Sequence, residues 1–75
     1  MYARIFQNKS HTRRFSITPK DPSGWDVREE RDEAIVRNVH YDDWHRVERA
    51  RRSFAIEAAM LFEQGWTEGG YSTKR

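Results

Sequence analysis

The 75-residue chain contains no cysteine and only two prolines and four glycines. Without cysteine it can have neither a disulfide nor a thiolate metal site. A domain of this size buries only about 60% of the surface that its unfolded chain exposes. We therefore expect its small core to be supplemented by self-association, and we predict a homodimer.

Long apolar runs are missing as well. The longest unbroken run covers residues 58–62, whereas a membrane-spanning helix needs about 20 apolar residues. We therefore predict a cytoplasmic protein that does not contact a membrane. The sequence also has no glycine-rich phosphate loop and no nucleophile elbow, so we expect no enzymatic activity, no catalytic residue and no cofactor.

Residues 41–66 have the length and apolar spacing of one amphipathic helix. The apolar stripe consists of Trp44, Val47, Ala50, Phe54, Ala55, Ala58, Leu61 and Phe62. Asp42 or Asp43 can cap the first turn, and Gly65 suits the left-handed position that ends a helix. Trp66 should then fold back onto Leu61. We predict a helix over about residues 42–64, packed on a core.

Alternation of apolar and polar residues predicts strands before this helix. In residues 13–18, Phe15 and Ile17 point to one face, and in residues 25–30, Trp25 and Val27 do the same. Residues 2–7 are β-prone, but their alternation is imperfect, so a first strand there stays open. The sequence thus predicts at least two strands that each bury one face.

Residues 34–41 predict a further strand, with Ile35, Val39 and Tyr41 on its inner side. The same count turns Arg37 inward. Either the register is wrong by one residue or Arg37 lies at an edge of the sheet. Both possibilities stay open from the sequence.

The simplest architecture that buries these stripes is an α+β domain. It has an antiparallel sheet of three or four strands, followed by one long C-terminal helix packed on one face. We assign residues 1–66 to this single domain and expect residues 67–75, which include two adjacent glycines, to form a flexible C-terminal tail.

Charges are unevenly distributed along the chain. Residues 1–20 carry basic side chains and no acid, residues 21–43 carry eight acids against three arginines, and the helix returns four arginines within residues 46–52. Arg51 falls inside the apolar stripe, where it must snorkel outward, stack on Trp44 or pair with Glu48. We favour the pairing. Mixed charges can simply join parts of a monomer, or they can form a face for an anionic ligand.

A sheet covered by one helix leaves its second face uncovered. We predict that this face and the helix arginines contact single-stranded nucleic acid, because basic side chains track phosphates. The expected binding residues are Arg13, Arg14, Arg28, Arg46 and Arg49. Tyr2, Phe6 and Tyr71 have no obvious inner position and could stack bases beside them.

The most enzyme-like cluster is residues 40–45, where His40, Asp42, Asp43 and His45 meet between the last strand and the helix. The spacing matches no established metal motif, and the aspartates already suit helix capping. We therefore predict no metal site there.

The strand opened by Gly24-Trp25, the charged turn, the Ile- and Val-rich strand and the long final helix resemble the PUR/PC4-like single-stranded nucleic-acid-binding proteins. The resemblance covers roughly residues 13–66 and is one of topology. It implies a strands-then-helix unit that pairs as a dimer and binds single strands, and it carries over no site residue.

Together these features predict a small, dimeric, non-enzymatic protein that binds single-stranded nucleic acid. Ile56 and Met60 lie off the apolar stripe of the helix, and we predict that they line the dimer interface. The alternative is a protein–protein adaptor or regulator that uses the same apolar pair and has no role with nucleic acid.

Overall fold

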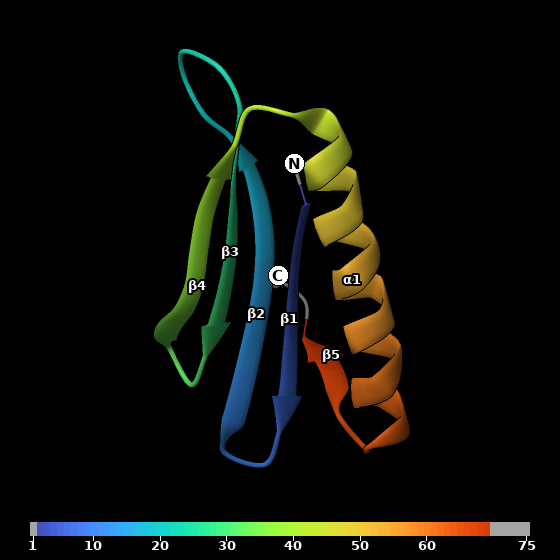
Figure 1. Cartoon of the computed structure of the whole chain (residues 1–75). Helices are drawn as coiled ribbons and strands as arrows, with labels where there is room; N and C mark the ends of the chain where they lie inside the picture. Colours follow the sequence, from blue (N-terminus) through green and yellow to red (C-terminus); the bar gives the residue numbers. More distant parts are fainter. Residues whose placement is uncertain (1, 70–75) are drawn as a thin grey trace.

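The computed structural model describes residues 2–69 and shows an antiparallel sheet with one helix against it (Figure 1). The elements are β1 (Tyr2–Asn8), β2 (His11–Pro19), β3 (Trp25–Arg31), β4 (Ala34–Tyr41), α1 (Trp44–Glu63) and β5 (Thr67–Gly69). The five strands lie in the order β4-β3-β2-β1-β5. The predicted α+β class, with strands first and one long helix after them, is confirmed.

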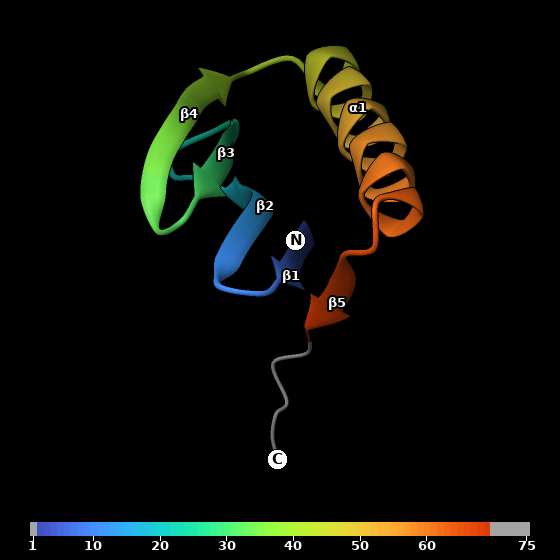
Figure 2. The same ribbon diagram turned by 90° about the horizontal axis from the view of Figure 1, so that it is seen from below.

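The sheet is strongly curled, and α1 lies along its concave side (Figure 2). We call this side the inner face and the opposite side the outer face. β4 forms one end of the curl and the short β5 the other. No helix within residues 2–69 combines the length and apolarity that crossing a bilayer requires.

The core lies between the inner face and α1. Its buried residues are Phe6, Phe15, Ile17, Val27, Val47, Ala50, Phe54, Ala58 and Leu61. Phe15 stacks on Phe54 of the helix, with ring centroids 4.7 Å apart, and Phe6 meets Phe15 edge-on at 5.9 Å. The expectation that Phe6 lacks an inner position is therefore wrong, because β1 is a full strand whose alternation turns this ring into the core. Ala55, expected in the buried stripe, is exposed.

Both ends of α1 follow the signals in the sequence. The Asp43 side chain accepts a hydrogen bond from the His45 backbone N–H at 2.9 Å, as an N-cap does. At the other end Gly65 adopts a φ of 93°, and the Trp66 N–H donates to the Leu61 carbonyl at 2.9 Å. Trp66 packs against the core. This is the Schellman arrangement, and it confirms that Gly65 stops the helix.

A bulge changes the register at the start of β4. Glu29 pairs with Arg37, but Glu30 pairs with Ile35, so Val36 is the extra residue. Ile35 therefore shares a face with Glu30, which lines the outer side of the sheet, and it is 56% exposed. The expected inner position of Ile35 is wrong for this reason. Arg37 does face inward, and it lies on the edge strand of the sheet.

The short strand β5 occupies residues expected to belong to the tail. It pairs antiparallel with β1, and the Arg4 guanidinium donates two hydrogen bonds to the Glu68 carboxylate, at 3.0 and 2.7 Å. This contact lowers the pKa of Glu68 below its usual value. The rest of the expected tail, residues 70–75 with Tyr71, lies outside the described residues.

Candidate anion-binding groove

The five arginines predicted to bind nucleic acid lie in three different places. Arg13 is on the inner face, where its guanidinium contacts Glu29 at 2.7 Å and Glu57 of α1 at 3.1 Å. Its side chain is only 11% exposed. Arg13 therefore joins the helix to the sheet, and its hydrogen-bonding groups point away from any ligand on the outer face.

Arg14 and Arg28 lie on the outer face of the sheet, as expected. They line a hollow together with Ala3, Ser16, Thr18, Lys20, Asp26 and Glu30. Arg28 lies 4.0 Å from the Glu30 carboxylate, and Lys20 lies 3.6 Å from Asp26. Two acids thus oppose the three cations here, which weakens the attraction of this face for phosphates.

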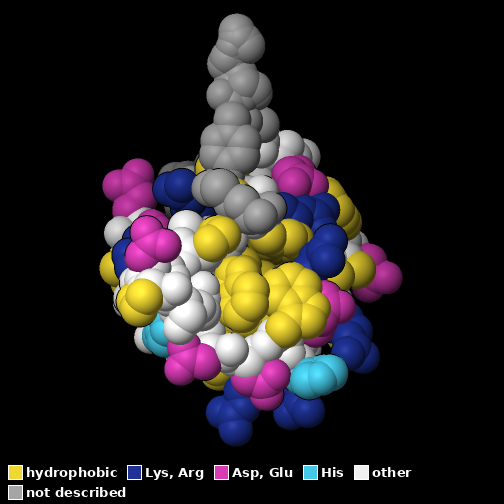
Figure 3. Space-filling model, turned by 90° about the horizontal axis from the view of Figure 1, so that it is seen from above, with side chains coloured by type: hydrophobic (Ala, Val, Ile, Leu, Met, Phe, Trp, Pro, Cys, Tyr) yellow, Lys and Arg dark blue, Asp and Glu magenta, His cyan; other side chains and the backbone are white. Residues whose placement is uncertain are grey.

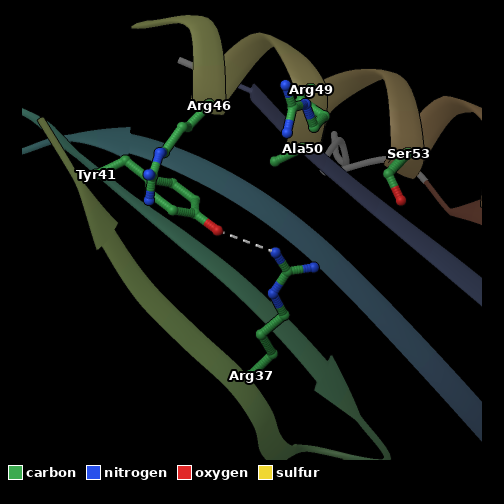
Figure 4. Close-up of a pocket in the computed structure, with 6 residues that line it drawn as sticks. All are labelled: Arg37, Tyr41, Arg46, Arg49, Ala50 and Ser53. Carbon is green, nitrogen blue, oxygen red and sulfur yellow. Dashed lines mark hydrogen bonds between the residues drawn. The ribbon is translucent and has the colours of Figure 1, made fainter. Parts of the chain in front are cut away.

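Arg46 and Arg49 project from α1 on the side that faces β4. There they line a groove of about 340 Å³ with Arg37, Tyr41, Ala50 and Ser53 (Figure 4). Arg37 and Tyr41 come from β4, and the other four residues come from the helix. We call this hollow the basic groove.

Among the residues that the structure describes, no acidic side chain lines the basic groove. Arg37 donates a hydrogen bond from Nη2 to the Tyr41 hydroxyl at 3.3 Å. Within residues 2–69, none of its three arginines lies within ion-pair distance of a carboxylate, whereas Arg4, Arg13, Arg28, Arg31 and Arg51 all do. Three guanidinium groups around one hollow repel one another unless an anion lies between them. Such an anion can accept the forked hydrogen bonds that arginine donates.

Two of the three arginines that line the basic groove, Arg46 and Arg49, were named from the sequence, and Arg37 was not. The inward position of Arg37 on its strand, which the alternation of residues 34–41 already indicated, was the available signal. The sequence could not show that the sheet curls, so that α1 covers the inner side of β4 only in part.

Arg51 behaves as predicted. Its Nη1 lies 3.7 Å from the Glu48 carboxylate, one turn earlier on the helix.

Ile56 and Met60 are exposed on α1, as their positions off the apolar stripe indicated. Their role in a dimer interface stays a prediction.

A second polar cluster joins the end of β4 to the start of the helix. His40 Nδ1 lies 2.9 Å from Asp26 on β3, and His40 Nε2 lies 3.1 Å from Asp42. These two carboxylates raise the pKa of His40, Asp26 being the larger cause, and His40 in turn is the main cause of a lowered pKa at Asp26. Within residues 2–69, no group of three or more histidine and acidic side chains has the geometry to hold a metal ion.

This cluster should make stability depend on pH. A raised histidine pKa stabilises the fold fully below the unfolded pKa of 6.5 and loses that contribution as pH rises through the folded value. The free energy of unfolding of wild type should therefore exceed that of His40→Gln most below pH 6.5, and the difference should shrink as pH rises above that value. Urea unfolding at a series of pH values measures the difference.

The matched control for this prediction is His45→Gln. The His45 side chain makes no ion pair within the described part of the chain, so its replacement should not reproduce the loss below pH 6.5. A difference between wild type and His40→Gln that stays constant across the pH range would contradict the assigned role of His40.

Comparison of the chain with protein-family models, with curated proteins and with solved structures gives no match. Fold and groove define an α+β protein with an acid-free hollow lined by three arginines. The resemblance to the PUR/PC4-like proteins stays a prediction.

Proposed function

We propose that the protein binds single-stranded nucleic acid and holds the backbone phosphates in the basic groove between β4 and α1. One observation carries this proposal: Arg37, Arg46 and Arg49 line one hollow, and no acidic residue in the described part of the chain lines it with them. Arginine favours phosphate because its planar fork matches two phosphate oxygens at once. The hydroxyl groups of Tyr41 and Ser53 offer further polar contacts to the sugar and phosphate.

The length of the basic surface favours a polymer over a single phosphate group. Arg52 continues the line of Arg46 and Arg49 along the helix, and it lines a neighbouring hollow together with Arg49, Ser53, Ile56 and Glu57. The Glu57 carboxylate is already engaged by Arg13, at 3.1 Å. Six residues of α-helix rise about 9 Å, so this line extends beyond the reach of one phosphate. Successive phosphates of a nucleic-acid strand can occupy it together.

The shape of the site favours a single strand. The basic groove lies between a curled sheet and a helix (Figure 2), so a ligand must bend into it. A single strand can do so because its backbone is flexible, whereas a duplex is stiff over a length far greater than this domain. Duplex DNA should therefore bind more weakly than a single strand of equal length.

The test is fluorescence anisotropy of a labelled oligonucleotide at low salt. Affinity should fall steeply as salt rises, and the double change Arg46→Glu/Arg49→Glu should lower it by about 100-fold or more, since phosphate contacts are lost and two repulsive charges are added. The matched control, Arg14→Glu/Arg28→Glu, changes the net charge equally on the outer face. It should lower affinity much less.

Two results would contradict this proposal. Absence of binding at low salt would remove a nucleic-acid role, and equal losses in the two double variants would show that the basic groove is not the binding surface. Displacement of the oligonucleotide by polyglutamate at equal charge would favour the second candidate, a protein adaptor that accepts an acidic segment. The exposed Ile56 and Met60 beside the arginine line are the observation that keeps this candidate open.

A further inference from the structure

The strands β1 and β3 and the helix α1 begin at the same end of the molecule (Figure 1). Residues of these elements and of β2 line a second hollow. It has a volume of about 230 Å³ and is lined by Tyr2, Ile17, Trp25, Trp44, Val47 and Arg51. We call it the aromatic pocket. Seen from this end, hydrophobic side chains gather at the centre of the surface, with charged side chains around them (Figure 3). Five of the six residues that line the aromatic pocket are apolar or aromatic, and the sixth, Arg51, is a cation.

The two tryptophan rings in the aromatic pocket are only partly covered by other side chains. Trp25 and Trp44 lie 5.1 Å apart between ring centroids at an angle of 58°, so neither ring covers the face of the other. Trp44 is 48% exposed, although it begins the apolar stripe of the helix. A large flat apolar surface therefore remains available to a ligand at the helix start.

The cation at this site selects among flat ligands. The Arg51 guanidinium carbon lies 6.0 Å from the centre of the Tyr2 ring, and its contact with Glu48 is long, at 3.7 Å. An aliphatic ligand would remove water from this guanidinium and offer it no hydrogen-bond acceptor. A heteroaromatic ring offers both a face for Trp44 and carbonyl or ring-nitrogen acceptors for Arg51.

We infer that the aromatic pocket receives one nucleobase of the bound strand, stacked on Trp44 with its polar edge toward Arg51. This inference rests on the proposed function for its ligand and goes beyond it by assigning base contacts. Pocket and groove lie on either side of the start of α1, where Trp44 lines the pocket and Arg46 lines the groove. They also share neighbouring strands, because Trp25 pairs with Tyr41. A strand with phosphates in the groove can therefore place a base in the pocket.

The experiment compares two labelled polymers with the same number of phosphates, an oligothymidylate and an abasic oligonucleotide of equal length. Wild type should bind the oligothymidylate about 10-fold more tightly or better, as stacking of one base on an aromatic side chain provides. Trp44→Leu should remove this preference without changing affinity for the abasic strand, and Trp44→Phe should keep most of it. The matched control is Phe62→Leu, because Phe62 is 47% exposed near the far end of the same helix; it should keep the full preference.

Failure of this inference is distinguishable from failure of the proposed function. Equal, salt-dependent affinity for the two polymers would overturn the base pocket and leave the phosphate groove in place. If neither polymer binds, millimolar adenosine added to the protein decides the matter through the NMR signals of the tryptophan indole N–H groups. Shifts that vanish in Trp44→Leu would sustain the pocket alone, and unchanged signals would overturn it.

Discussion

Replacing Arg13 with alanine should lower the free energy of unfolding by about 3 kcal/mol. The guanidinium of Arg13 joins three elements, because it lies on β2 and contacts Glu29 of β3 and Glu57 of α1. Its removal leaves the largely buried Glu29 carboxylate beside a second carboxylate, with only the more distant Arg31 guanidinium, 3.8 Å away, as its cation. Glu57 is 40% exposed, so water screens its share of the loss, and Glu29 accounts for most of it.

Urea unfolding of wild type, Arg13→Ala and the control Arg14→Ala measures this effect. Arg14 neighbours Arg13 in the sequence but lies on the outer face, and its replacement should change stability by less than about 0.5 kcal/mol. Adding Glu29→Gln to Arg13→Ala should recover part of the loss, because the carboxylate that lost its closest cation is then neutral. Similar losses in the two single variants would show that the contacts of Arg13 do not hold the helix to the sheet.

The two neighbouring arginines show what the sequence could and could not predict. Alternation places Arg13 on the same face as Phe15 and Arg14 on the other, so local pattern alone already separated them. Their grouping as one basic binding patch ignored that separation. The acid that meets Arg13 from the helix is 44 residues away in the sequence, and no local pattern could identify it.

Elements with local signals were predicted well. The helix follows from its apolar period and from the Asp43 and Gly65 ends, and the inner positions of Phe15, Ile17 and Val27 follow from alternation. The bulge at Val36 was not predictable, because it depends on how β4 meets β3. Residues 67–69 likewise become a strand only because β1 lies beside them.

The basic groove and the aromatic pocket depend on curvature, which is a property of the whole sheet. Arg46 and Arg49 could be identified from their helical spacing, and Arg37 from its inward position. Their convergence requires β4 to lie at the far end of the curl, with its inner side only partly covered by α1 (Figure 2). The apolar period of the helix predicted that Trp44 is part of the core. In the structure its side chain is 48% exposed, because the sheet covers the first turn of α1 only in part.

Replacing Phe15 with alanine should be the most damaging single change, lowering the free energy of unfolding by about 4 kcal/mol. Phe15 is completely buried and stacks on Phe54 at 4.7 Å, while the Arg13 guanidinium carbon lies 5.2 Å from its ring centre. The cavity left by the ring opens between β2 and α1, where neighbouring aromatic rings cannot collapse without moving the helix. A domain of this length has a total stability of about 4–11 kcal/mol, so this single change should remove between about a third and all of it.

Phe62→Ala is the matched control, since it removes the same ring from a position that is 47% exposed. Phe62 meets Phe6 edge-on at 5.5 Å, and loss of this contact and of half the burial should lower stability by about 1 kcal/mol. Circular dichroism during urea unfolding compares the two variants. Equal losses would mean that the core is not centred on Phe15. The Arg13 guanidinium lies over the Phe15 ring. The double variant Arg13→Ala/Phe15→Ala should therefore lose less stability than the two single variants lose together. This result is expected if one network of contacts holds α1 on the sheet.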